Sequence, residues 1–378
     1  MNVAGLIFTN IHDEFLPELT RQRAIASVPY GGRYRLIDFA LSNMVNANIT
    51  DIGVVTHNNY RSLLDHIGTG KDWDLARRSG GITMLPPFVS SADSTSANTL
   101  YTTRLEALMG VLSFIVHCKQ DYIVLSDCDI VWNLHLSEVI DAHIASGADI
   151  TVVSRHLEDR SRADLTRDTY QVIVRHNNLI SDFLEVVDDT EREIDICTNL
   201  FVLKRQTLLN IIRGAMAHHN SNFYTYLARN AYSMRIQAFP YTGYYARIDS
   251  LPAYFRCSME MLDPAVRREL LRTEGQPIFT KVRNSAPSLY RTGANVSNSV
   301  IADGCIIEGT VENCIVFRGV KVGRGSVIRN SVLLQNTTIA DGVSLNCVIT
   351  DKNVVIRDGR TLSGDASLPF FIGKGKMI

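Results

Sequence analysis

The first two thirds of the chain alternate between short apolar runs and segments whose apolar residues return at helical spacing. Residues 3–8 are continuously apolar, which is typical of a strand buried on both faces of a parallel sheet. Residues 39–48 have a helical pattern, and residues 52–56 form a second apolar run. This order predicts a βαβ unit, and therefore a parallel sheet covered by helices.

The same alternation extends to residue 262. The run at 122–126 predicts a central strand, and Asn177-Asn178 predicts the turn of a hairpin within 170–184. The other expected strands are 82–88, 149–154 and 198–203, and residues 236–247 are expected to form a strand and a turn. The other expected helices are 97–118, 136–145, 206–212, 222–229 and 251–262. We therefore expect an α/β domain over residues 1–263 and a linker over residues 264–290.

After this linker the pattern changes to short β-branched runs separated by single glycine, asparagine or aspartate residues. Val316, Val322, Ile328 and Leu334 recur every six residues. A period of six with inward-pointing aliphatic side chains is typical of a parallel β-helix. We expect this domain and a C-terminal tail over residues 291–378. The open ends and flat sides of a β-helix favour assembly with other subunits.

Composition and charge narrow the function classes. The 378 residues carry a net charge of −1, which argues against a nucleic-acid-binding protein. The seven cysteines are scattered without C-x-x-C spacing, so neither a disulfide framework nor a zinc site is predicted. The N-terminus lacks the features of a signal peptide, and no apolar run approaches the ~18 residues of a membrane span. We expect a cytoplasmic protein with no membrane partner.

Two aspartates, Asp127 and Asp129, lie at the carboxyl end of the predicted strand 122–126. Ligands bind at this end of the strands in open α/β sheets, and paired carboxylates suit a divalent metal that bridges phosphates. The alternative is that both residues cap the following helix and fill a turn. The spacing leaves both interpretations open.

The first strand is not followed by a phosphate-binding loop. Such a loop needs glycines, so that backbone N–H groups can approach the phosphates, and usually a cation. Residues 9–14 contain neither, and Asp13 and Glu14 stand there instead. Residues 28–39, by contrast, are rich in glycine, arginine and aromatic residues, which indicates a functional loop that runs into a helix.

Two segments carry candidate ligand-binding residues. Within residues 28–39, an arginine beside two glycines either holds the phosphate of an effector or pairs with Asp38 as a structural anchor. The second segment, residues 68–81, is either a loop on the substrate side or a solvated connection. The candidate ligand or effector residues are Gly31, Gly32, Arg33, Arg35, Asp38, Lys71, Arg77 and Arg78.

These motifs resemble those of the ADP-glucose pyrophosphorylase (glucose-1-phosphate adenylyltransferase) family. The resemblance is carried by VPYGGRYRLIDFALSN and by GGITMLPPF, which follows GTGKDWDLARR. It covers essentially the whole chain. It implies a Rossmann-like nucleotidyltransferase domain with a mainly parallel sheet, followed by a left-handed β-helix of hexapeptide repeats. In this family glucose 1-phosphate attacks the α-phosphorus of ATP and releases pyrophosphate, and Mg²⁺ bridges the phosphates.

The chain departs from the family at the groups that handle phosphate and metal. The glycine-rich loop is absent, and the lysine that follows it aligns with Ile25. The metal-binding aspartate at the strand end aligns with Cys128, the sugar-phosphate lysine with Val186, and the second metal-binding aspartate with Arg247. Because catalysis in this family rests on preorganised charge, these differences imply a chain with no catalytic or metal-binding residues.

The resemblance therefore points to the GlgD-type subunit of the bacterial enzyme. It implies a regulatory pseudoenzyme that needs no cofactor itself and joins a catalytic, Mg²⁺-using subunit in a hetero-oligomer, expected to be a tetramer, for glycogen synthesis. A homo-oligomer and a phosphorylated effector are further expectations. One alternative is an active nucleotidyltransferase with a shifted metal site at Asp127 and Asp129, which are otherwise a remnant site. The other is a module that senses a sugar phosphate or nucleotide.

Overall fold

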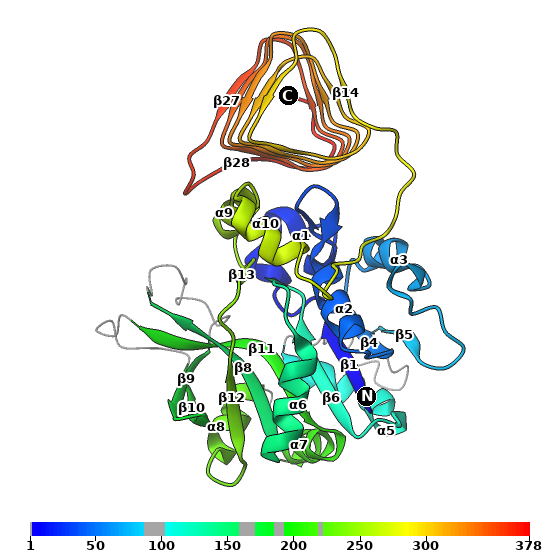
Figure 1. Cartoon of the computed structure of the whole chain (residues 1–378), viewed down its shortest axis with the longest axis vertical. Helices are drawn as coiled ribbons and strands as arrows, with labels where there is room; N and C mark the ends of the chain where they lie inside the picture. Colours follow the sequence, from blue (N-terminus) through cyan, green and yellow to red (C-terminus); the bar gives the residue numbers. More distant parts are fainter. Residues whose placement is uncertain (1, 87–102, 159–170, 185–192, 218–221) are drawn as a thin grey trace, which may run out of the picture.

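The computed structural model describes residues 2–86, 103–158, 171–184, 193–217 and 222–378. An α/β domain is followed by a β-helix, which stands on one side of it (Figure 1). Some positions considered above lie outside the described residues: 87–88 of the expected strand 82–88, 97–102 of the expected helix 97–118, Tyr170 of the expected hairpin segment, and Val186.

In the described part of the chain, a nine-stranded mixed sheet forms the centre of the α/β domain. Its strands are β1 (Val3–Phe8), β4 (Asp51–Val55), β5 (Gly81–Leu85), β6 (Tyr122–Asp127), β8 (Ile150–Leu157), β9 (Val172–His176), β10 (Leu179–Leu184), β11 (Ile194–Lys204) and β12 (Ile236–Pro240). Their order is β5-β4-β1-β6-β11-β8-β12-β10-β9. The four strands from β5 to β6 are parallel to one another. Strand β11 runs antiparallel to both β6 and β8.

Helices cover both faces of the sheet (Figure 1). One face is covered by α2 (Leu36–Asn46), α3 (Arg61–Ile67) and α6 (Leu136–Ser146), and the other by α4 (Arg104–Gly110), α5 (Leu112–His117), α7 (Arg205–Ala217) and α8 (Phe223–Asn230). Successive residues of β1 serve the two faces, since Leu6 packs in one core and Ile7 in the other. Burial on both faces explains why the strands are continuously apolar.

Two local predictions can be compared with the structure. The hairpin is confirmed: β9 and β10 are joined at Asn177-Asn178, and Asn177 has a φ of 55°. The single helix expected over 97–118 is instead two helices, α4 and α5, which meet at Val111. No helix in the described ranges is long and apolar enough to cross a membrane.

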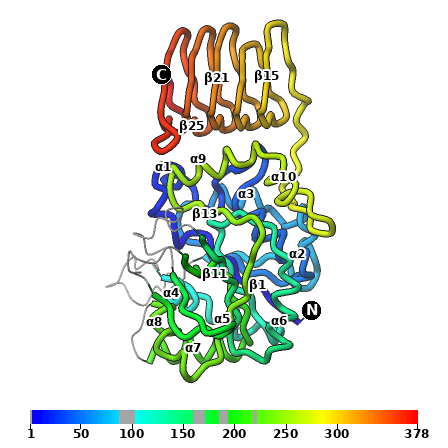
Figure 2. Tube along the Cα trace, turned by 60° about the vertical axis from the view of Figure 1, so that its left-hand side comes forward, coloured from blue at the N-terminus to red at the C-terminus, as the bar shows by residue number. Residues whose placement is uncertain are grey.

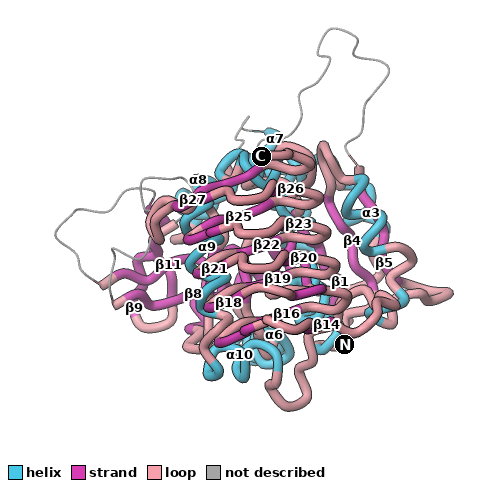
Figure 3. The backbone as a smooth tube through the Cα atoms, turned by 90° about the horizontal axis from the view of Figure 1, so that it is seen from above, coloured by secondary structure: helices cyan, strands magenta, loops and turns pink. Residues whose placement is uncertain are grey.

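Three five-stranded parallel sheets form the β-helix, which has a triangular cross-section (Figure 1) and stacked coils (Figure 3). The first sheet contains β14 (Leu289–Tyr290), β17 (Ile306–Ile307), β20 (Lys321–Val322), β23 (Thr338–Ile339) and β26 (Val355–Ile356). The second contains β15 (Asn295–Ser297), β18 (Thr310–Glu312), β21 (Val327–Arg329), β24 (Ser344–Asn346) and β27 (Thr361–Ser363). The third contains β16 (Val300–Ile301), β19 (Ile315–Val316), β22 (Val332–Leu333), β25 (Val348–Thr350) and β28 (Phe370–Ile372).

The step of six predicted inside the β-helix fails at one residue. Val316 pairs with Leu333, a spacing of 17 residues rather than three full hexapeptides. Leu333 therefore lies inside the β-helix beside Val316, whereas Leu334 packs in the core that the β-helix shares with the α/β domain. The prediction for Leu334 was wrong because one corner of the coil is a residue short.

The two domains share a hydrophobic contact. The third sheet of the β-helix packs against α9 (Leu251–Glu260), α10 (Pro264–Leu271) and the N-terminal segment (Figure 2). Ile315, Phe317 and Ile349 are fully buried there. The segment 264–290, expected to be a linker, thus begins with a helix. Its Leu270 is buried, because α10 presents this residue to the shared core.

Candidate functional site

The end of β6 brings two carboxylates together. Side chains alternate along a strand, so Asp127 and Asp129 share one side while Cys128 turns into the core beneath α2 and α6. The position that aligns with the family's metal-binding aspartate is thus a core cysteine, and the two carboxylates that flank it lie on the other side of the chain. Both aspartates are buried, with 4% and 1% of their surface exposed.

Arg104 neutralises the first of these carboxylates. Its Nη2 donates to Asp127 Oδ2 at 2.6 Å, and its Nη1 donates to the carbonyl of Asn199 at 3.2 Å. The guanidinium lies 5.1 to 5.9 Å from the ring centroids of four aromatic residues, Phe8, Phe201, Phe223 and Tyr224. Burial lowers the pKa of Arg104, but Asp127 and, with smaller effects, Tyr224, Cys197 and Asp129 together raise it above its ordinary value, so the arginine stays charged.

The start of α4 places Arg104 at this point. Thr103 accepts a hydrogen bond from the N–H of Glu106 and the Glu106 carboxylate accepts one from the N–H of Thr103, which is a capping box. Arg104 is then the first helical residue, where the helix dipole disfavours a cation by about 0.3–1 kcal/mol. Its pairing with Asp127 offsets this cost.

Arg247 neutralises the second carboxylate, and His12 contacts the same carboxylate. Strand β13 (Ala246–Arg247) pairs with β7 (Ile130–Val131) and so holds Arg247 beside the end of β6. Arg247 Nε donates to Asp129 Oδ2 at 3.2 Å, and His12 Nδ1 lies 2.9 Å from the same oxygen. Burial raises the pKa of Asp129, but Arg247 and then His12 bring it well below its usual range.

The arginines decide whether this strand end fits Mg²⁺. His12, Asp127 and Asp129 each offer one ligand atom, and these atoms lie within 4.8 Å of one another. Mg²⁺ prefers an octahedron of oxygen ligands. Here two guanidinium groups already balance the two carboxylates, and a third ligand would be a histidine nitrogen. The residues do not fit the ion that the resemblance implied for the catalytic relatives.

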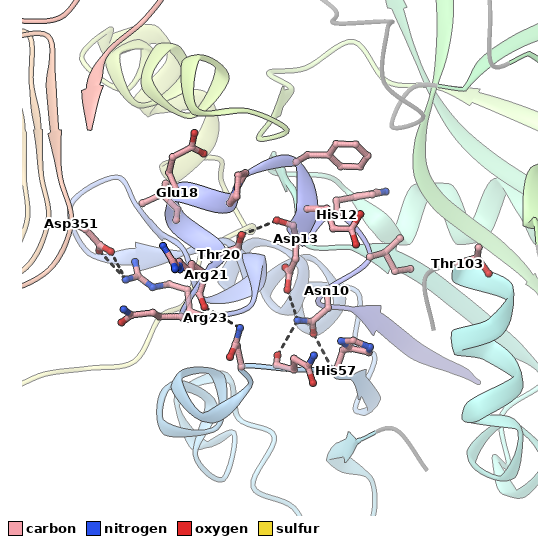
Figure 4. Close-up of a pocket in the computed structure, with 18 of the residues that line it drawn as sticks. Asn10, His12, Asp13, Glu18, Thr20, Arg21, Arg23, His57, Thr103 and Asp351 are labelled. Carbon is pink, nitrogen blue, oxygen red and sulfur yellow. Dashed lines mark hydrogen bonds and ion pairs between the residues drawn. The ribbon is translucent and has the colours of Figure 1, made fainter. Parts of the chain in front are cut away.

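A closed loop replaces the phosphate-binding loop after β1 (Figure 4). Asp13 accepts hydrogen bonds from the N–H of Ile25 and from Asn10 Nδ2, both at 2.7 Å. Asn10 Oδ1 in turn accepts the N–H of His57 at 3.1 Å. Burial raises the pKa of Asp13 to about 7. The Asp13 side chain thus takes up the backbone donor at the position of the missing lysine, where it offers a phosphate no positive charge.

A large cleft of about 1570 Å³ remains beside this loop. Its walls come from residues 10–23, from Arg104 and the start of α8, and from Asp351 and the tail of the β-helix. Figure 4 shows the N-terminal segment between the α/β domain and the β-helix, with Arg23 pointing at Asp351. The chain thus has a cleft beside this loop, although the residues that bind phosphate and metal in the catalytic relatives are replaced.

A second cavity, of about 330 Å³, lies between the two domains. We call it the interdomain cavity. Its lining includes one carboxylate, Asp303, and a larger set of cationic side chains: Arg33, Arg35, Lys281, Arg283, Arg318 and Lys352. Burial, then Arg35 and Arg23, lower the pKa of Lys352 to about 7. Burial also lowers the pKa of Arg35 to about 10. Burial is the main cause of both shifts, whereas the lining itself carries more cationic side chains than carboxylates, an imbalance that a bound anion would relieve.

The structure separates the roles of Arg35 and Asp38. Asp38 Oδ2 caps α2 by accepting the N–H of Arg35 at 3.0 Å, and its Oδ1 lies 2.6 Å from His66 Nε2. The Arg35 guanidinium instead donates to Ser62 and lines the interdomain cavity. Asp38 is thus a buried anchor whose partner is His66, which the sequence patterns did not identify.

The remaining candidates have structural places. Gly31 and Gly32 have φ of 56° and 85°, and a Cβ on Gly32 would contact Val300 of the β-helix. Lys71, Arg77 and Arg78 are exposed and line neither cavity. Their loop lies against the segment that enters the β-helix, since Asp72 Oδ1 accepts the N–H of Val282 at 3.4 Å.

Comparisons with known proteins agree with this architecture. The nucleotidyl transferase family matches residues 15–189, and the GlmU-like C-terminal hexapeptide family matches residues 286–368. The chain is 31% identical to the glycogen biosynthesis protein GlgD of Bacillus subtilis, over 98% of this chain and 95% of that protein. It is 34% identical to GlgD of Geobacillus stearothermophilus, over 86% and 82%.

Catalytic relatives are slightly more distant. The chain is 27% identical to a glucose-1-phosphate adenylyltransferase of Fervidobacterium nodosum, over 95% of this chain and 85% of that protein. The two family matches follow the same domain order as the structure, and the GlgD proteins align with most of the chain. This chain belongs to the family of GlgD glycogen biosynthesis proteins.

Proposed function

We propose that this chain is a non-catalytic regulatory subunit in glycogen biosynthesis, which assembles with a catalytic glucose-1-phosphate adenylyltransferase paralogue. One observation carries the proposal: Arg104 and Arg247 neutralise the carboxylates at the end of β6, where the family needs a metal. The closed loop around Asp13 supports it independently. A nucleotidyltransferase with a shifted metal site is disfavoured by the same two arginines.

Assembly is supported by the unequal ends of the β-helix. At the last coil the C-terminal tail covers β26, because Met377 bridges to Val355 and the N–H of Arg357 donates to the carbonyl of Ile378 at 2.8 Å. Among the residues that the structure describes, β27 and β28 of the last coil each pair on one side only, and so do β14, β15 and β16 of the first coil. Leu289 and Tyr290 there are 49% and 51% exposed. A second β-helix could cover such exposed strand edges, and we propose that the β-helix of the catalytic paralogue packs against this end.

The first prediction concerns a mixing assay. ADP-glucose formation with Mg²⁺ is measured for this chain, for the paralogue and for their mixture. We expect no turnover by this chain and a mixture whose rate or effector response differs from that of the paralogue. Tyr290→Asp should remove the difference, whereas Tyr232→Asp, at a side chain that is 97% exposed on the α/β domain, should preserve it. A mixture that always behaves as the paralogue does would contradict the proposal.

We further propose that the interdomain cavity senses an anion such as a phosphorylated metabolite. Its cationic lining supports this, with a single carboxylate among the lining residues. Arg33 and Arg35, two candidates from the sequence, lie in the cavity wall. The lowered pKa values of Lys352 and Arg35 reflect burial together with neighbouring cations, which is the condition that a bound anion would relieve.

The second prediction is that anion binding weakens as pH rises. Lys352 loses its charge as pH passes about 7, while His66, whose pKa is lowered by burial, stays neutral above 6.5. Sulfate does not titrate in this range, so any difference in sulfate affinity that calorimetry finds between pH 6.5 and 8.5 comes from groups of the protein. Losing one charged hydrogen bond should weaken sulfate binding roughly tenfold. Lys352→Met should abolish this dependence, and an unchanged pH profile in that variant would refute the assignment.

A further inference from the structure

The cleft and the interdomain cavity meet at one buried ion pair. Arg23 Nη2 donates to both carboxylate oxygens of Asp351, at 2.8 and 2.7 Å. The two side chains are 3% and 4% exposed. Arg23 and Asp351 line the cleft, whereas the next residue, Lys352, lines the interdomain cavity. The N–H of Lys352 donates to Asp351 Oδ1 at 2.7 Å, so the two walls are joined directly.

On the side of the α/β domain, a series of contacts connects this ion pair to the end of β6. Arg23 belongs to segment 10–25, the closed loop that replaces the phosphate-binding loop. This segment is fastened to itself by Asp13, which accepts the N–H of Ile25. It is fastened to the end of β6 by His12, whose Nδ1 lies 2.9 Å from Asp129. Segment 10–25 therefore spans from the neutralised carboxylates to the β-helix (Figure 4).

We propose that the Arg23–Asp351 ion pair is a coupling joint, through which an anion in the interdomain cavity stiffens segment 10–25 and the strand end it contacts. The inference rests on the proposed anion sensing. An anion that binds Lys352 and Arg35 fixes the coil that carries Asp351. Because Asp351 holds Arg23 by two hydrogen bonds, ordering of that coil restrains the loop. No residue of the strand end has to contact the anion.

The removal of charge from the joint need not disturb the fold. Removing one partner would leave the other charge buried, which typically costs about 3–5 kcal/mol, whereas replacing both by apolar residues is often neutral. The informative variant is therefore the double substitution Arg23→Met with Asp351→Leu. It removes one positive and one negative charge together, so the net charge near the interdomain cavity is unchanged. A matched control is Arg77→Met with Asp74→Asn, which breaks an exposed ion pair outside both cavities.

The test is hydrogen exchange of the full chain with and without sodium sulfate, beside calorimetric titration of the same proteins. In the parent protein we expect sulfate to bind and to slow exchange within residues 10–25 by roughly fivefold or more, the lower range of typical coupling between sites. The control variant should behave in the same way. The double variant should still bind sulfate, but exchange within residues 10–25 should no longer respond.

Two results would overturn the joint, and they are distinguishable. If the double variant binds sulfate and still shows the parent's slowing of exchange, the ion pair does not couple the cavities, while anion sensing stands. If the parent protein binds no sulfate, anion sensing fails and the joint fails with it.

Discussion

Replacing Arg104 by methionine is expected to lower the free energy of unfolding by about 3–5 kcal/mol, because Asp127 would be left buried without its main counter-charge. The ion pair is 2.6 Å long and both side chains are at most 3% exposed. The substitution also removes a cation from among four aromatic rings. Urea unfolding measures the loss, provided that the slope of the unfolding free energy against urea stays constant.

Two further variants show whether the loss of stability comes from the unpaired charge of Asp127. Arg104→Met combined with Asp127→Leu removes both charges and should recover most of the lost stability, because buried ion pairs are often replaceable by apolar residues of similar volume. Arg77→Met, at an arginine that is 44% exposed, should change stability by less than about 0.5 kcal/mol. If Arg104→Met were no more destabilising than Arg77→Met, Arg104 would not be the group that neutralises Asp127.

Much of the fold follows from periodicity alone. Continuous apolar runs located the strands, and the step of six located the β-helix. Periodicity does not reveal strand direction, because a strand buried on both faces is apolar whether it runs parallel or antiparallel. The reversed direction of β11 could therefore not be predicted. Nor does a step of six anticipate a coil of 17 residues, which moved Leu334 out of the β-helix interior.

The candidate site was only partly predictable. Alternation along β6 is a sequence-level signal that Asp127 and Asp129 share a face, and it places Cys128 in the core. The capping box at Thr103 was also readable and would have placed Arg104 at a helix start. By contrast, His12 and Arg23 find their partners more than a hundred residues away. Such contacts depend on the folded topology and leave no local pattern.

Arg247→Asp has the largest expected effect on chemistry, since it should convert the neutralised strand end into a divalent-metal site. The substitution removes the cation that lies 3.2 Å from Asp129 and adds a third carboxylate beside His12 and Asp127. More carboxylates and fewer cations raise affinity for divalent ions. We expect Kd for Mn²⁺ of about 10⁻⁴–10⁻³ M, the range of weak carboxylate sites.

Mn²⁺ binding measured by electron paramagnetic resonance on the parent chain and on Arg247→Asp tests the central claim most directly. Arg77→Asp is the control, because it changes the net charge by the same amount at an exposed arginine outside the site. Our account predicts no binding at millimolar Mn²⁺ by the parent and by Arg77→Asp, and saturable binding by Arg247→Asp. Saturable binding of Mn²⁺ by the parent chain, abolished by Asp129→Asn, would contradict it.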